Sequence, residues 1–215
     1  VNNDFAGIKN WFNEFYARDT SRKIRAVQKA KGERGVPLTV NVPYGYVKDP
    51  ENPKHWLVDP EAAAIVKRIF SMCMEGRGPT QIANQLWADK VLTPTAYKLS
   101  HGRSTNAPAP EDPYRWDKRA VSLILERREY TGCTVNFKTY TNSIWDKKRH
   151  LNPVENQAIF PDTHERIIDD DVFEKVQEIR SQRHRMTRTG KSSIFSGMVY
   201  CADCGSKMQY GSSNN

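Results

Sequence analysis

Three apolar stripes with helical spacing, between residues 59 and 128, constrain the fold of this chain more than any other feature. In each stripe apolar side chains recur every three or four residues, which is typical of a helix that buries one face. The stripes consist of Ala62, Ile65, Val66, Ile69, Phe70 and Cys73, then Ile82, Ala83, Leu86 and Trp87, then Ala120, Val121, Ile124 and Leu125. We expect the first two helices to pack against the third.

The ends of these helices carry suitable residues. Asp59 can accept the first free N–H groups as an N-cap, and Pro60 fits the first helical position because its missing N–H would have no partner there. Gly76 ends the first helix. A tight turn at 77–79 leads to the second helix, and the third begins at Asp117.

Helix, tight turn, helix, loop and helix is the arrangement of helix-turn-helix DNA-binding modules. The third helix would be held rigid, and its first turns could reach base edges in the major groove. The candidate DNA-contacting residues there are Arg115, Lys118, Arg119 and Ser122. An ordinary three-helix bundle with a solvated charged face has the same pattern, so both alternatives stay open.

The composition favours a polyanionic partner. Lys and Arg total 33 against 25 acidic residues, a formal net charge of +8. No apolar run is long enough to cross a bilayer, which predicts a soluble protein. The sequence has no phosphate-binding loop, no dinucleotide fingerprint and no nucleophile with a paired base, so we assign no catalytic residue and no small-molecule substrate.

The flanking segments are less regular. Residues 4–31 predict an amphipathic helix that can bend or restart at Thr20–Ser21, and residues 92–113 predict an irregular stretch. Lys98 and Arg103 lie in that stretch and are further candidate DNA contacts. Residues 130–160 predict strands and loops, and a last helix is expected from about residue 169 to 184.

A basic segment follows the last helix, and its cations have no acidic neighbour between them: Arg183, Arg185, Arg188 and Lys191. A flexible basic strand can lie in a narrow minor groove, where the negative potential is enhanced. The alternative is a solvated tether with incidental charge.

Cys201 and Cys204 form a C-x-x-C pair closed by Gly205. Two thiolates on such a turn are half of a tetrahedral zinc site. A redox C-x-x-C would need a following helix. Strand-like segments on both sides favour a truncated zinc ribbon instead, and we expect zinc in the full-length protein, with only half of its site here.

Taken in order, motifs along nearly the whole chain resemble the large serine recombinases of the resolvase–invertase superfamily. The motifs are Ser21-Arg22-Lys23-Ile24, Val42-Pro43-Tyr44-Gly45-Tyr46, Asp59-Pro60-Glu61-Ala62, Leu92-Thr93-Pro94, Tyr130-Thr131-Gly132, His164-Glu165-Arg166-Ile167-Ile168, and Phe195-Ser196-Gly197 with Cys201 and Cys204. Each is loose, but their order is specific.

The resemblance implies a mainly α fold with small β elements (α+β) and a helix-turn-helix-like three-helix core. It divides the chain into the end of a long helix from a catalytic domain (1–35), a DNA-binding recombinase domain (36–184), a basic linker (185–194) and a truncated zinc ribbon (195–215). The segment 99–113 is longer than the family needs, and the ribbon stops before its second cysteine pair.

The resemblance also implies a function: sequence-specific binding of a double-stranded DNA attachment site. The parent protein, of phage integrase or transposon type, would integrate or excise DNA through a phosphoserine intermediate formed by a domain absent here, so this chain should be inactive alone. Dimers and tetramers of the full-length protein, and a bacterial cytoplasmic location near the nucleoid, are implied as well. The alternative is a basic protein–protein interaction module without catalytic activity.

Overall fold

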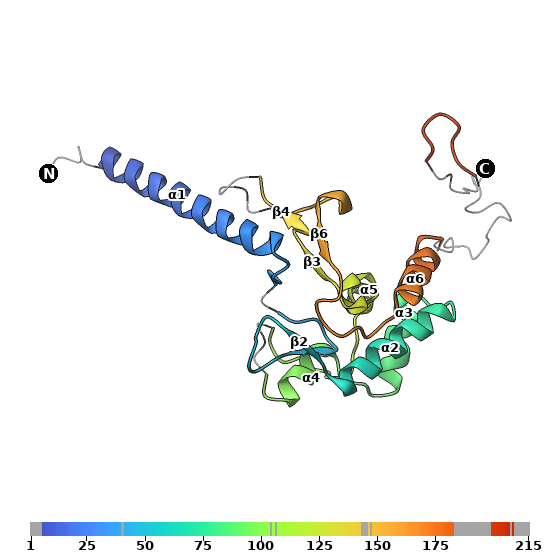
Figure 1. Cartoon of the computed structure of the whole chain (residues 1–215). Helices are drawn as coiled ribbons and strands as arrows, with labels where there is room; N and C mark the ends of the chain where they lie inside the picture. Colours follow the sequence, from blue (N-terminus) through green and yellow to red (C-terminus); the bar gives the residue numbers. More distant parts are fainter. Residues whose placement is uncertain are drawn as a thin grey trace.

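A long helix projects from a compact helical body in the computed structural model (Figure 1). The structure describes residues 6–39, 41–103, 105, 107–142, 146, 148–182, 199–206 and 208. Its helices are α1 (Ala6–Glu33), α2 (Pro60–Met74), α3 (Pro79–Ala88), α4 (Pro94–Ser100), α5 (Lys118–Glu126) and α6 (Asp170–Gln182). Short antiparallel strands accompany them, so the predicted α+β class is confirmed.

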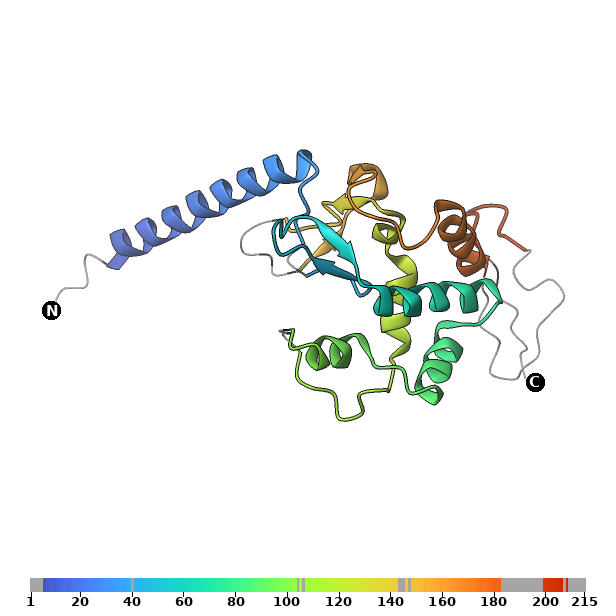
Figure 2. The ribbon, with the colours of Figure 1, turned by 60° about the horizontal axis from the view of Figure 1, so that its bottom comes forward.

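The centre of the body is formed by α2, α3 and α5, the trio that the apolar stripes predict. Helix α3 packs against α5, and α2 contacts both. Figure 2 shows α5, in yellow-green, crossing α2. Helix α6 packs on α2 and α5 and closes the core. The side chains of Val66, Leu86, Val121 and Leu125 are completely buried between these helices.

Helix α4 corrects the prediction that residues 92–113 are irregular throughout. Thr93 caps it, since its hydroxyl oxygen accepts a hydrogen bond from the Ala96 N–H at 3.4 Å, and Pro94 occupies the first position. Tyr97 is buried. A helix of 7 residues is too short to show a periodic stripe, but the Thr-Pro start was a usable signal.

In the described ranges, three small antiparallel sheets accompany the helices. Strand β1 (Tyr46–Lys48) pairs with β2 (Trp56–Val58), β3 (Thr134–Asn136) with β6 (Ala158–Phe160), and β4 (Thr139–Tyr140) with β5 (His150–Leu151). Two 3₁₀ turns, η1 (Arg128–Thr131) and η2 (Val154–Asn156), complete the elements. The strands predicted within residues 130–160 are confirmed, and each is only two or three residues long.

Tyr130 fixes the exit of α5 to the β1–β2 hairpin. It is completely buried, stacks on Tyr46, and donates a hydrogen bond to the Tyr44 carbonyl at 2.8 Å. Gly132 follows with φ +86°, and a Cβ there would lie 2.8 Å from the carbonyl oxygen of His164. Only glycine fits this close approach of two backbone segments.

His164 is a buried structural residue. Its ring packs against Tyr46 and Trp56, each with centroids 4.8 Å away. Nε2 lies 2.8 Å from the Glu129 carbonyl, and because a carbonyl only accepts, Nε2 carries the hydrogen. Burial lowers the pKa of His164.

Two further predictions differ from the structure. Helix α1 continues unbroken through Thr20–Ser21, so no bend occurs there. Trp87, placed on the inner face of its helix by the sequence, is 49% exposed and donates its indole N–H to Asp112 at 3.0 Å. Among the described helices, none combines the length and apolarity that a membrane crossing demands.

Candidate nucleic-acid interface

Helix α5 is anchored at its start. Asp117, where the sequence predicts the helix to begin, caps it: its side chain accepts a hydrogen bond from the Arg119 N–H at 2.6 Å. Trp116, just before the helix, is buried and donates its indole N–H to the Val91 carbonyl at 3.0 Å. The first turn of α5 is therefore fixed in position relative to the chain that links α3 and α4.

The far end of α5 is fastened to α6. Gln177 donates to the Leu125 carbonyl at 2.7 Å, and Arg180 pairs with Glu126 at 2.6 Å. The pairing neutralises the carboxylate that α5 carries at its end. An anionic ligand would consequently meet no unpaired acid on the last turn of this helix.

The predicted DNA-contacting cations lie on the surface. Arg115, Lys118 and Arg119 are exposed, and Ser122 is half-buried. Within the described part of the chain, no side-chain hydrogen bond or ion pair engages Arg115, Lys118 or Arg119. The structure thus brings three free cations together at the start of a rigid helix, while Ser122 lies on its flank.

Leu123 is exposed on the same helix, although the sequence pattern did not predict it as a site residue. It is 45% exposed, whereas Val121 and Leu125 on the opposite face are completely buried. A helix turns by about 100° per residue, which places Leu123 with Arg119 nearly opposite the core. The positions of the buried residues were a sufficient signal for finding it.

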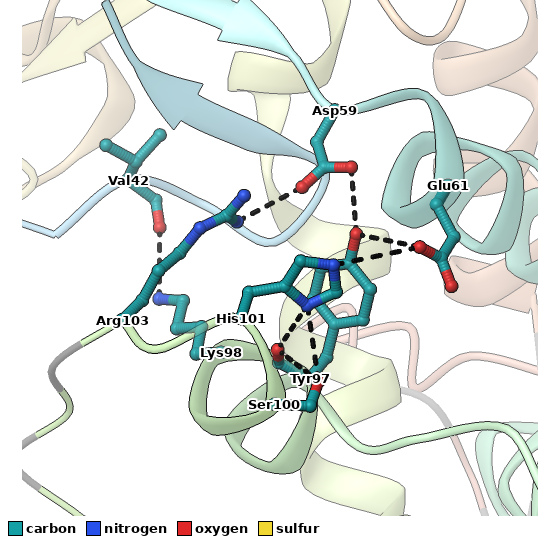
Figure 3. A network of polar contacts seen from close by, with 8 residues as sticks. All are labelled: Val42, Asp59, Glu61, Tyr97, Lys98, Ser100, His101 and Arg103. Atoms are coloured by element: carbon teal, nitrogen blue, oxygen red, sulfur yellow. Dashed lines mark hydrogen bonds and ion pairs between the residues drawn. The ribbon is translucent and has the colours of Figure 1, made fainter. Parts of the chain in front are cut away.

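Arg103 and Lys98 lie in a separate polar network around α4 (Figure 3). Arg103 pairs with Asp59 at 3.1 Å, and the Tyr97 hydroxyl donates to the same carboxylate at 2.9 Å. Burial would raise the pKa of Asp59, but the hydrogen bonds from Tyr97 and Arg103 hold it below its usual value. Arg103 is therefore already paired, unlike the cations of α5.

The same network corrects the role of Asp59. It occupies the N-cap position of α2, yet its side chain makes no cap hydrogen bond to that helix. Instead it joins α2 to α4 and to Arg103. The hydrogen bonds that Asp59 accepts come from residues distant in the sequence, so the residue preferences of helix starts could not predict them.

Lys98 is the predicted contact that lies on α4 itself. Its ammonium lies 3.5 Å from the Val42 carbonyl, and the side chain is partly buried. Burial lowers the pKa of Lys98, with the nearby charges of Arg127 and Arg103 adding to the effect. His101 lies beside it, within 3.9 Å of Glu61 (Figure 3). The described part of the predicted site therefore has two groups: exposed cations without side-chain partners at the start of α5, and hydrogen-bonded cations in and just after α4.

The predicted linker contacts, Arg183, Arg185, Arg188 and Lys191, lie outside the described residues. The C-x-x-C turn is described. The Gly205 N–H donates to the Cys201 carbonyl at 2.9 Å and the Met208 N–H donates to the Val199 carbonyl at 2.9 Å, so the segment folds back on itself.

The two thiols of this turn interact. Hydrogen bonds with Ser206 and with Cys201 lower the pKa of the Cys204 thiol, which favours the thiolate that zinc binds. Cys201 and Cys204 fit two of the four ligands of tetrahedral zinc. In the described ranges no three His, Cys, Asp or Glu side chains are grouped for a metal ion, so zinc binding stays a prediction.

The chain resembles known proteins both in sequence and in fold. A family model described as Recombinase matches residues 60–183. The uncharacterized protein YefB of Bacillus subtilis (strain 168) is 32% identical over 96 residues, which are 45% of this chain and 32% of YefB.

Two solved structures share the fold at 18% identity and a TM-score of 0.50. One is an LSR–DNA complex, where the match covers 86% of this chain and 47% of that one. The other comes from work on the sequence requirements of the Listeria innocua prophage attP site, with 85% and 62% covered. The chain therefore spans less than two thirds of each of these relatives.

Proposed function

The chain belongs to the Recombinase family, with a recombinase domain of the large serine recombinase type, and from this premise we propose that it binds double-stranded DNA in a sequence-specific manner through α5. One observation carries the proposal. Helix α5 is buried on one face and fixed at both ends, while Arg115, Lys118 and Arg119 stay exposed without side-chain partners in the part described.

These residues suit two kinds of contact. An α-helix fits the major groove of B-DNA, where an arginine can bridge the O6 and N7 atoms of guanine. Arg119 lies on the outward face of α5 and has the geometry for this role, whereas Lys118 and Arg115 suit phosphates on either side. A fixed helix places these groups without the loss of conformational entropy that a mobile segment would incur.

The other predicted contacts would add affinity from the flanks. Lys98 and Arg103 could reach phosphates only if their present hydrogen bonds were exchanged for DNA oxygens. The linker cations Arg183, Arg185, Arg188 and Lys191 would follow the minor groove. Support for a DNA partner comes from the net charge of +8 and from a structural relative that was solved as a DNA complex.

We extend the proposal to the parent protein. It would bind an attachment site, assemble into dimers and tetramers, and integrate or excise DNA in a bacterial cytoplasm. The phosphoserine chemistry would be supplied by a domain outside these 215 residues. Cys201 and Cys204 would contribute two thiolates to a structural zinc ion, whose role is to fold a ribbon that contacts DNA.

The test is selection of the 215-residue chain on a random duplex library, followed by titration of the selected duplex in rising salt. We expect a preferred sequence, and affinity that falls steeply with salt because bound cations displace counterions. Lys118→Ala should reduce the salt slope by about 1. Lys67→Ala is the control, since it removes another exposed lysine, from α2.

Two results would contradict the proposal. One is binding to heparin as tight as to any duplex, which would favour the protein-interaction alternative. The other is affinity that does not change between low and moderate salt. Selection with single-stranded RNA provides the remaining control.

A further inference from the structure

The outward face of α5 has an apolar residue at its centre. Taking about 100° per residue, Arg119 and Leu123 both lie nearly opposite the buried side chains of Val121 and Leu125. The two outward residues are four positions apart, so their Cβ atoms are about 5–6 Å from each other. They form one continuous strip of surface.

The neighbours of Leu123 leave this strip open. Ser122 is half-buried on one side, and Glu126, one turn further on, is held by Arg180 of α6 at 2.6 Å. Leu123 is 45% exposed, so about half of its surface is uncovered by the described residues. Single exposed leucines are ordinary on protein surfaces. Leu123 differs because it lies between the free cations of α5 and its neutralised end.

Base edges in the major groove offer one apolar group, the C5-methyl group of thymine. A leucine next to a guanine-binding arginine can cover that methyl group and exclude water from it. Successive base pairs are about 3.4 Å apart, so the spacing of Arg119 and Leu123 corresponds to one or two base steps. Arginine recognises guanine O6 and N7, and an apolar side chain recognises thymine.

We propose that Leu123 is a specificity-determining residue that contacts the C5-methyl group of a thymine one or two base pairs from the base bound by Arg119. The inference rests on the proposed function, because it requires α5 to lie in the major groove. It adds a base preference that the charged residues alone do not provide. Lysine and arginine donate hydrogen bonds to acceptors on guanine, whereas the thymine methyl group offers no acceptor.

The experiment uses the duplex selected by the full chain. Each thymine is replaced in turn by deoxyuridine, which removes only the methyl group. With the unaltered chain we expect one position at which the replacement weakens binding about fourfold, the effect of burying one methyl-sized group. With Leu123→Ala this difference should vanish at that position, while affinity for the deoxyuridine duplex stays within about twofold of that of the unaltered chain.

Leu151→Ala is the matched control, because Leu151 is 84% exposed on β5, away from α5. It should keep the fourfold methyl effect. The deoxyuridine series with the unaltered chain needs no variant, so it stands even if Leu123→Ala folds poorly.

The outcomes are distinguishable. A preferred sequence with no methyl-sensitive thymine, or a methyl effect that persists in Leu123→Ala, overturns the role of Leu123 and leaves the proposed function intact. A library that yields no preferred sequence contradicts the proposed function, and the role of Leu123 with it.

Discussion

Helices α1 and α5 are both amphipathic, but they use their apolar faces in opposite ways. The stripe of α5 is buried against α2 and α3, and its polar face is exposed. Along α1 the apolar side chains are between 47% and 64% exposed: Ile8, Trp11, Phe12, Phe15, Tyr16, Ile24 and Val27. Figures 1 and 2 show α1 extending away from the body.

The comparison separates two properties that one periodic pattern encodes. Spacing of three and four residues predicts a helix in both places. It does not say whether this chain supplies the surface that covers the stripe. For α5 the cover is present, which makes the helix a rigid support for Arg119. For α1 the described residues supply little cover, and its stability depends on local interactions such as the stacked pair Trp11 and Phe15, with centroids 5.7 Å apart.

The largest expected difference between the two helices is in stability. Leu125→Ala should lower the free energy of unfolding by about 2–5 kcal/mol, because it leaves a cavity in the core. Phe15→Ala removes a larger side chain from α1 but should cost less than about 1 kcal/mol, since the ring is already half exposed. Urea unfolding followed by circular dichroism measures both. Equal losses would show that the α1 stripe is covered in solution.

The next effect concerns the anchoring of α4. Asp59→Ala should cost about 1–3 kcal/mol, because the Arg103 guanidinium loses its acceptor and the buried Tyr97 hydroxyl keeps only its longer contact with Glu61 at 3.3 Å. Asp59→Asn should cost less, since an amide oxygen still accepts from Tyr97. Thermal unfolding of the two variants tests this order. If both left stability unchanged, Asp59 would not hold α4.

A smaller effect is the pH dependence contributed by His164. Burial lowers its pKa, so the folded chain keeps it neutral where unfolded histidine, with a pKa of about 6.5, takes up a proton. Acidification below about pH 6.5 therefore favours the unfolded chain, and stability falls until the pH passes the lowered pKa. His164→Phe should flatten the curve of unfolding free energy between pH 7 and 5. If the variant kept the same dependence of unfolding free energy on pH, His164 would not be the residue that causes it.

Hydrogen–deuterium exchange compares the local stability of α1 and α5 and needs no variant. Backbone amides in the middle of α5 should exchange with deuterium at rates set by global unfolding, because the helix is fastened at both ends. Amides of α1 should exchange much faster, since fraying there exposes little additional apolar surface. Mass spectrometry of peptides from the two helices would measure the ratio, and similar protection would contradict the contrast.

The sequence was sufficient where local signals and burial agreed. Asp117 followed by a stripe of four residues predicted where α5 begins, and the order of motifs predicted the family. Helix α4 was missed because 7 residues are too few for a periodic signal. Trp87 was misplaced because its indole N–H finds a partner in Asp112, 25 positions away, which helical periodicity does not encode.

In the candidate site too, features that follow from a local pattern were predicted and contacts between distant residues were not. Exposure of Arg115, Lys118 and Arg119 followed from the face that the stripe left free. The pairing of Arg103 with Asp59 spans 44 positions, so no local pattern predicts it. Leu123 carries no charge and so was not predicted as a DNA contact, although the same helical geometry places it beside Arg119.

Protection of guanine N7 from methylation by dimethyl sulfate would show whether α5 lies in the major groove, because N7 is exposed there. On the selected duplex, the unaltered chain and Lys67→Ala should protect the same guanine, and Arg119→Ala should lose that protection with about 1–3 kcal/mol of binding free energy. Protection that is identical in all three proteins, or absent from every guanine of a tightly bound duplex, would contradict the placement of α5 in the major groove.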